Sequence, residues 1–170
     1  MNALYILYDD TCSHSVRHCD WLAQQEAVVP LHFLPQRAKE ARFRFPGIEA
    51  HIAPRELVVI SDDGQLWTGP TASVMCLFSL EQHRELAQRL AHPALLAYSR
   101  TALELLSREV FEITCLLRRS DDKELGQTLR LYSESVRKHY QLPPEITVAA
   151  RADGGCKVSA WREGEPHPLQ

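Results

Sequence analysis

The amino-acid sequence predicts an α/β fold in which helices cover a sheet. Two short apolar runs, at residues 3–8 and 30–35, have the length and composition of strands, and a helical pattern separates them. Residues 56–69 have the pattern of a β-hairpin, and the chain from residue 72 onward is mostly helical in its apolar spacing. With 170 residues, 45% of them hydrophobic, the chain can bury the core of one domain with an appendage.

Short motifs place the strands. ALYILY is too short for an independent helix and predicts a buried strand, and a helical pattern begins at Ser13. PLHFLP, bounded by prolines, predicts the second strand, and a short helix is expected around 37–43. ELVVIS, the turn DDG and QLWTG predict an antiparallel pair. A strand–helix–strand opening, an antiparallel pair and a covering helix follow one another as in a thioredoxin-like α/β sandwich.

The second half of the chain is predicted to be an all-α cap. Residues 72–117 have a helical pattern with one break at His92-Pro93, and either Thr71 or Ser73 is expected to cap the first helix. The apolar residues of 95–117 fit one face of a long helix that packs on the sheet.

The C-terminal segment predicts an amphipathic helix at 122–140 and a hairpin at 146–160 around a Gly-Gly turn. A hairpin is marginal alone, so it must dock on the main body or on a second copy, and docking on a second copy would make a homo-oligomer through residues 122–162. We therefore divide the chain into a thioredoxin-like domain with its cap (1–117), a helix-plus-hairpin extension (118–162) and a disordered tail (163–170).

Charge and composition exclude several classes of partner. The net charge of −3 gives no global field that favours nucleic acid or an anionic membrane. The basic stretch QRAKEARFRF contains Glu40 and is short, so we interpret it as a solvated segment. No apolar run is long enough to cross a bilayer, and the N-terminus lacks the pattern of a signal peptide. Five cysteines without a signal peptide predict free thiols in a reducing cytoplasm.

Cys12 is the candidate reactive residue. It lies in the turn between the first strand and the first helix, where unpaired N–H groups and the helix dipole stabilise a thiolate. His14, Arg17 and His18 could add positive potential, whereas Asp9 and Asp10 would act against it unless they cap the helix. A buried, inert core cysteine is an equally open interpretation.

Ser15 stands one helical turn after Cys12, and its hydroxyl can donate to a thiolate but cannot form a disulfide. Cys19 is seven residues from Cys12, about 10 Å along a helix, which is too far for a disulfide while the helix is intact. We expect Cys19, Cys76 and Cys115 to be packing residues, and nothing in the sequence singles out Cys156.

Other kinds of site have weaker support. His14 and His18 are four apart and could hold a metal ion on one helix face, but two solvated histidines are the preferred interpretation, and we expect no metal. The sequence contains no phosphate-binding glycine loop and no Gly-x-Ser-x-Gly motif.

Three blocks of the sequence resemble the DCC family of thioredoxin-like proteins, which are described as thiol-disulfide oxidoreductases. The blocks are YILYDDTCSHSVRHCDWL, ELVVISDDGQLWTGPTASVMCLF and LAHPALLAYSRTALELLSREVF, and they cover roughly residues 4–115. The matching residues are Tyr8, Asp9, Cys12, Trp21, Leu22, Glu56, Leu57, Gly64 and Gly69.

Two departures from the family pattern change the expected chemistry. The family has a Tyr-Asp-Gly-x-Cys-x-x-Cys turn, whereas this chain has Asp10 in place of the glycine and Ser15 in place of the second cysteine. The resemblance also implies a cis-proline beside the cysteine, and Pro54 is the nearest candidate for this substrate-groove position.

The resemblance implies a thiol-disulfide oxidoreductase that acts through Cys12 alone. Its partner would be a protein disulfide or glutathione as co-substrate, and no resident cofactor is expected. The alternative is a non-catalytic binding or oligomerisation module that kept the fold. A glutathione-transferase-like enzyme, in which Ser15 or Cys12 activates glutathione, is a third interpretation.

Overall fold

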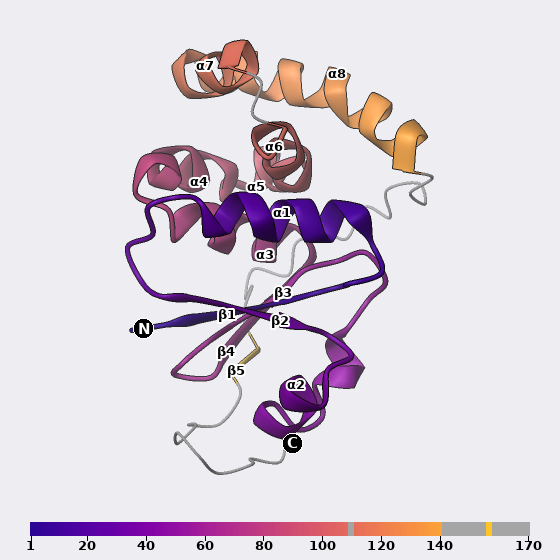
Figure 1. The fold of residues 1–170 in the computed structure, drawn as a ribbon. Helices are drawn as coiled ribbons and strands as arrows, with labels where there is room; N and C mark the ends of the chain where they lie inside the picture. The colour runs from indigo at the N-terminus through magenta and orange to yellow at the C-terminus, as the bar shows by residue number, and fades with distance from the viewer. Residues whose placement is uncertain (109–110, 141–155, 158–170) are drawn as a thin grey trace.

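The computed structural model describes residues 1–108, 111–140 and 156–157, and their core is a mixed sheet (Figure 1). Its strands are β1 (Leu4–Tyr8), β2 (Leu31–Pro35), β3 (Val58–Ser61), β4 (Gln65–Thr68) and the two-residue β5 (Cys156–Lys157). The strand order is β2-β1-β3-β4-β5. β1 is parallel to β2 and antiparallel to β3, and β3 is antiparallel to β4. The predicted α/β class is confirmed.

The helices lie on both faces of the sheet. They are α1 (Ser13–Ala23), α2 (Lys39–Arg44), α3 (Gly69–Phe78), α4 (Arg84–Leu90), α5 (Pro93–Leu96), α6 (Ser99–Leu106), α7 (Phe111–Arg119) and α8 (Asp122–Tyr140), with 3-10 turns η1 (Ile48–His51) and η2 (Glu81–His83). Figure 1 shows α1 and α3 on one face of the sheet and α2 on the other, with α4–α8 stacked beyond α1 and α3.

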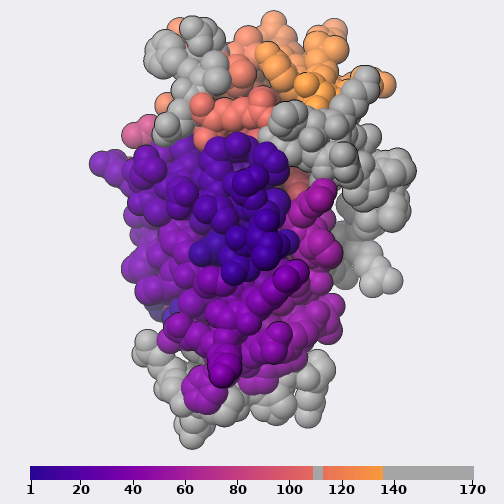
Figure 2. Space-filling view, turned by 45° about the vertical axis from the view of Figure 1, so that its right-hand side comes forward, coloured from indigo at the N-terminus to yellow at the C-terminus, as the bar shows by residue number. Residues whose placement is uncertain are grey.

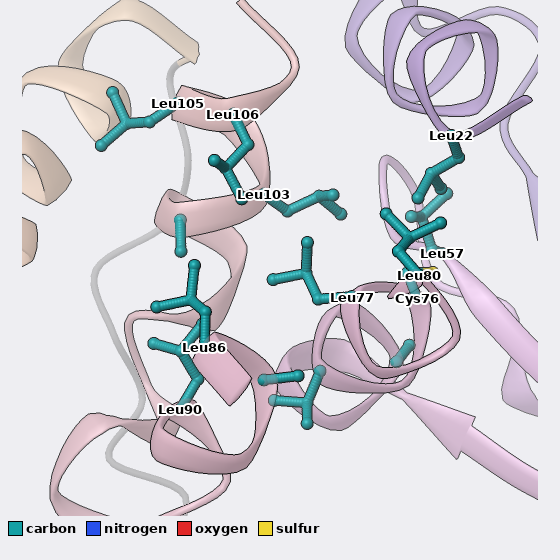
Figure 3. Packing of buried hydrophobic residues seen from close by; sticks show 14 of the residues in the cluster. Leu22, Leu57, Cys76, Leu77, Leu80, Leu86, Leu90, Leu103, Leu105 and Leu106 are labelled. Carbon is teal, nitrogen blue, oxygen red and sulfur yellow. The ribbon is translucent and has the colours of Figure 1, made fainter. Parts of the chain in front are cut away.

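The pleat of the strands divides the core between these two faces. Leu4 and Ile6 of β1 belong to the large apolar cluster with α1, α3 and the later helices, whereas Tyr5 and Leu7 belong to the smaller cluster with α2 and η1. Alternate side chains of a strand point to opposite faces, so a strand that is apolar throughout must be covered on both sides. Figure 3 shows how leucines of α3, α4 and α6 fill the larger cluster.

The start of α3 differs from the prediction. The helix begins at Gly69 rather than near Ala72, with Pro70 in its first turn, and Thr68 occupies the N-cap position without a side-chain hydrogen bond. Thr71 donates its hydroxyl to the carbonyl of Thr68 at 2.8 Å. The expected cap by Thr71 or Ser73 is therefore wrong, because the fixed φ of proline starts the helix one turn earlier.

The long helix expected over residues 95–117 is also wrong. The chain forms α5, α6 and α7 instead, and α6 packs on α1 and α3 rather than directly on the sheet. Every residue of α6 from Thr101 to Leu106 is buried. Because α6 is covered on all sides, the chain turns at both of its ends so that neighbouring segments can pack around it. The apolar pattern of the sequence does not show where these turns lie.

The C-terminal helix confirms the prediction for residues 122–140, since α8 has these bounds. Its Leu125 and Leu129 are fully buried, and α8 packs on α6. Of the hairpin predicted at 146–160, only Cys156–Lys157 lies within the described residues, and it pairs antiparallel with β4. The predicted tail at 163–170 lies outside them. In the described part of the chain, no helix has the length and apolar content to cross a membrane.

His83 gives the fold a pH dependence that can be measured. Its ring is 2% exposed and lies 5.4 Å from the Trp21 ring. The Nη2 atom of Arg118 lies 3.5 Å from its Nε2. Burial, assisted by the charge of Arg118, lowers the pKa of His83 from 6.5 to about 4.

Because the folded-state pKa is depressed, the unfolded chain binds this proton first as the pH falls. The contribution of neutral His83 to the free energy of unfolding is complete above pH 6.5 and is lost as the pH falls toward 4. This loss amounts to about 2–3 kcal/mol between pH 7 and 4.5. Urea unfolding at these two pH values should show this loss, and His83→Phe should reduce it. His51→Gln, at a half-buried position of η1, is the control and should keep the wild-type loss; equal losses in all three proteins would contradict the assignment.

Candidate functional site

Cys12 lies at the N-cap of α1, directly after β1, as the sequence predicts. Its backbone is extended, with φ −103° and ψ 111°, and no side chain caps the helix. Its amide donates to the Asp9 carbonyl at 3.1 Å, and its carbonyl accepts from the Val16 amide at 3.1 Å. The residue is 9% exposed, so the thiol lies at the edge of the buried interior, where the first N–H groups of α1 are unpaired by the helix itself.

Asp9 fixes the turn that carries Cys12. Its buried carboxylate accepts from the Thr11 hydroxyl at 2.6 Å, the Thr11 amide at 3.1 Å and the Arg55 amide at 3.3 Å. These hydrogen bonds, that of the Thr11 hydroxyl foremost, lower the pKa of Asp9. Asp9 therefore stabilises the turn and links it to the loop before β3, and it does not cap α1.

Three loops meet at the carboxyl ends of the parallel strands β1 and β2. The Gln36 amide donates to the Tyr8 carbonyl at 2.8 Å, and the Gln36 side chain donates to the Glu56 carbonyl at 2.6 Å. Arg100 of α6 donates to the Arg55 carbonyl at 2.6 Å. In open α/β sheets, ligands commonly bind outside this end of the strands.

Pro54 lies in one of these loops, next to Arg55, whose amide contacts Asp9. The described residues contain no cis peptide bond, so the bond before Pro54 is trans. The cis geometry implied for this position is therefore wrong. Arg55 has a positive φ of 63°, which is uncommon for a residue with a side chain. A role for Pro54 in a substrate groove stays a prediction.

Ser15 is 1% exposed and lies in the first turn of α1. No hydrogen bond joins its hydroxyl to Cys12 among the described residues. Donation to a Cys12 thiolate therefore stays a prediction.

The other thiols differ in burial. Cys19 and Cys76 are buried packing residues, as expected, and burial raises the pKa of both thiols, that of Cys76 to about 12. Cys115 in α7 is only half-buried, because part of this helix faces solvent. Cys12, Cys19, Cys76 and Cys115 are all free thiols. The surroundings of the Cys156 side chain lie outside the described residues.

The expectation of two solvated histidines is wrong for His18. Its ring is buried, and its Nε2 lies 2.7 Å from the Oε2 of Glu104 on α6. Arg17 also pairs with Glu104, as does Arg108 at 3.1 Å. Arg17 and His18 are therefore directed toward Glu104, so much of the positive charge expected near Cys12 is balanced by a carboxylate.

Sequence reasoning missed Glu104. The one available signal was an acidic residue within the apolar run TALELL, which a solvated helix face would explain equally well. Arg17 and His18 lie more than eighty residues from Glu104 along the chain, so only the fold brings them to it, whereas Arg108 follows in the turn after α6. No group of three or more His, Cys, Asp or Glu suited to a metal ion occurs in the described part.

Comparisons of the chain with protein-family models, with curated proteins and with solved structures find no match. The resemblance to the DCC family accordingly stays a prediction from the residues.

Glu104→Ala should destabilise the protein strongly, because it leaves Arg17, His18 and Arg108 without their shared anion. Removing one partner of a buried ion pair costs about 3–5 kcal/mol, and we expect the lower end because both arginines reach solvent. Urea unfolding at pH 7 measures the loss. Glu40→Ala, at an exposed position of α2, should change the stability by less than about 0.5 kcal/mol, and equal losses for the two variants would contradict the role of Glu104.

Proposed function

We propose that this protein is a thioredoxin-like redox protein that acts through one thiol, Cys12. The strand order β2-β1-β3-β4, with β1 parallel to β2 and an antiparallel β3–β4 pair, supports a thioredoxin-like sandwich. The position of α1 and α3 opposite α2 supports it as well. The observation that carries the proposal is the placement of Cys12 at the N-cap of α1, at the carboxyl end of β1.

Cys12 is also better placed than the core thiols. Burial holds Cys19 and Cys76 in their protonated form, and a thiol is a poor nucleophile compared with a thiolate. Cys12 is also buried, at 9% exposed, but it differs from Cys19 and Cys76 because it lies at the amide groups of a helix N-terminus.

The reaction proceeds in two exchanges. The Cys12 thiolate attacks one sulfur of a disulfide RSSR, the S–S bond breaks, a Cys12–SR mixed disulfide forms, and RS⁻ leaves. A second, external thiolate then attacks the SR sulfur, forms the new disulfide and returns Cys12 as a thiolate. Ser15 stands where a resolving cysteine would be and cannot perform this second step, so glutathione or a protein thiol must supply it.

Intact-protein mass spectrometry after treatment with oxidised glutathione tests this chemistry. Wild-type protein should gain one glutathione on Cys12, and added reduced glutathione should remove it. Cys12→Ser should lose this adduct, whereas Cys115→Ser, which removes the half-buried thiol of α7, should keep it. Peptide mapping that finds the adduct on other cysteines and none on Cys12 would contradict the proposal.

A non-catalytic module that assembles through the C-terminal helix is the second candidate. Leu131 of α8 is 76% exposed, although Leu125 and Leu129 on the opposite side of this helix are buried. Figure 2 shows part of this end of the molecule, in orange, at the surface. An interface with a second copy would cover this exposed leucine.

Sedimentation velocity over a range of concentrations tests the second candidate. If α8 forms the interface, wild type should associate as concentration rises, and Leu131→Glu should be monomeric at the same concentrations. Phe43→Glu changes the exposed aromatic residue of α2 on the other side of the sheet and should leave the association unchanged. A wild-type protein that stays monomeric at all concentrations would contradict this function.

A further inference from the structure

Glu104 joins the helical cap to the helix that begins at Cys12. It lies on α6 and is 2% exposed. One carboxylate oxygen faces Nε2 of His18 at 2.7 Å, and the other accepts from Arg17 and from Nε of Arg108 at 3.1 Å. A buried carboxylate needs such partners, so Arg17 and His18 are held in fixed positions on α1.

Arg17 extends this network to the first turn of α1. Its Nη2 lies 2.9 Å from Nδ1 of His14, which is two residues after Cys12. A guanidinium can only donate hydrogen bonds, so Nδ1 of His14 must be the acceptor and carries no proton in this arrangement. The chain of contacts therefore runs from Glu104 through Arg17 to His14, in the first turn of the helix that begins after Cys12.

We propose that Glu104 is a positioning residue for Cys12. It anchors Arg17, Arg17 keeps His14 in its neutral form, and the cap thereby limits how much positive charge the first turn of α1 carries close to Cys12. This inference rests on the proposed function, in which the Cys12 thiolate is the nucleophile.

The other charged groups around the turn have contacts of their own. Asp9 is held by Thr11 and by the Arg55 amide, with Arg37 near enough to influence its charge. Arg100 pairs with Glu56 at 3.7 Å and donates to the Arg55 carbonyl. Asp10 is exposed to solvent. None of these contacts involves Glu104, so a change at Glu104 acts on the turn through α1.

The expected effect is large enough to measure. Position 18 lies six residues after Cys12, about 9 Å along the helix axis, and position 14 lies closer. At an effective dielectric constant near 20, one unit charge at this range changes the thiolate fraction by roughly twentyfold without salt, and screening over a Debye length of about 8–10 Å reduces this to roughly three- to tenfold. Salt screens such an interaction less when the groups are partly buried.

The test is the rate of Cys12 alkylation by iodoacetamide between pH 5 and 10, followed by peptide mass spectrometry on the full-length protein. Glu104→Gln keeps the shape of the side chain and removes its charge. We expect its alkylation profile to move to lower pH, with a rate at pH 6 roughly three- to tenfold above wild type. An unchanged profile would overturn the inference.

A second variant tests the route through His14. In Glu104→Gln combined with His14→Gln, no imidazole remains at position 14 to take up a proton, and the rate at pH 6 should return to within about twofold of His14→Gln alone. A shift that survives the removal of His14 would overturn the proposed route. Arg108→Gln removes a partner of Glu104 that lies in the turn after α6 rather than on α1, and it should leave the profile within about twofold of wild type.

Cys19 and Cys76 report on mere loosening of the fold, because both are buried. A variant that only opens the structure would label these thiols together with Cys12 and raise the rate without moving the pH profile; that result in Glu104→Gln would overturn the inference. A wild-type Cys12 that neither alkylates nor forms the glutathione adduct would instead refute the proposed function. A reactive wild-type Cys12 with an unmoved profile in Glu104→Gln refutes the inference alone.

Discussion

The ion cluster around Glu104 is the contact on which the arrangement of the two halves of the protein depends. A carboxylate inside the protein is costly unless cations and hydrogen-bond donors surround it. Arg17 and His18 come from α1 in the sheet domain, and Arg108 follows Glu104 on the cap. Apolar packing between α1 and α6 would tolerate sliding, whereas these polar contacts fix one register between the two helices. Because α1 begins at Cys12, the same contacts fix the candidate thiol.

The sheet supplies the second constraint. β1 is buried on both faces, so the chain must cover it with α1 and α3 on one side and α2 on the other. The parallel pair β1–β2 brings the loops after both strands to one end, and the antiparallel β3 brings the loop before it to the same end. Asp9, Gln36 and Arg55 bind these loops together there. The directions of β1, β2 and β3 therefore place the candidate site, and its own residues hold it together.

A one-thiol site gives the surrounding charges more influence than a two-thiol site would. In the proposed function, with Ser15 in place of a resolving cysteine, the lifetime of a mixed disulfide would depend on an external thiol and on the stability of Cys12 as a leaving group. A helix N-terminus favours the thiolate, and in our proposal the pairing of Arg17 with Glu104 moderates that effect. A reactive Cys12 thiol is therefore compatible with a stable fold as long as Glu104 keeps its ion pairs.

Local patterns determined much of this protein. Apolar runs of strand length, the DDG turn and amphipathic spacing placed β1–β4, α1, α2 and α8 close to their observed bounds, because these signals depend on neighbouring residues only. The same local reasoning located Cys12 at the start of α1 and identified Cys19 and Cys76 as core residues. Tertiary structure decided the rest: it divided residues 95–117 among α5, α6 and α7, and it buried His18 against Glu104. Those outcomes depend on contacts between segments far apart in the chain, and the free energy of such contacts appears only when the helices are packed together.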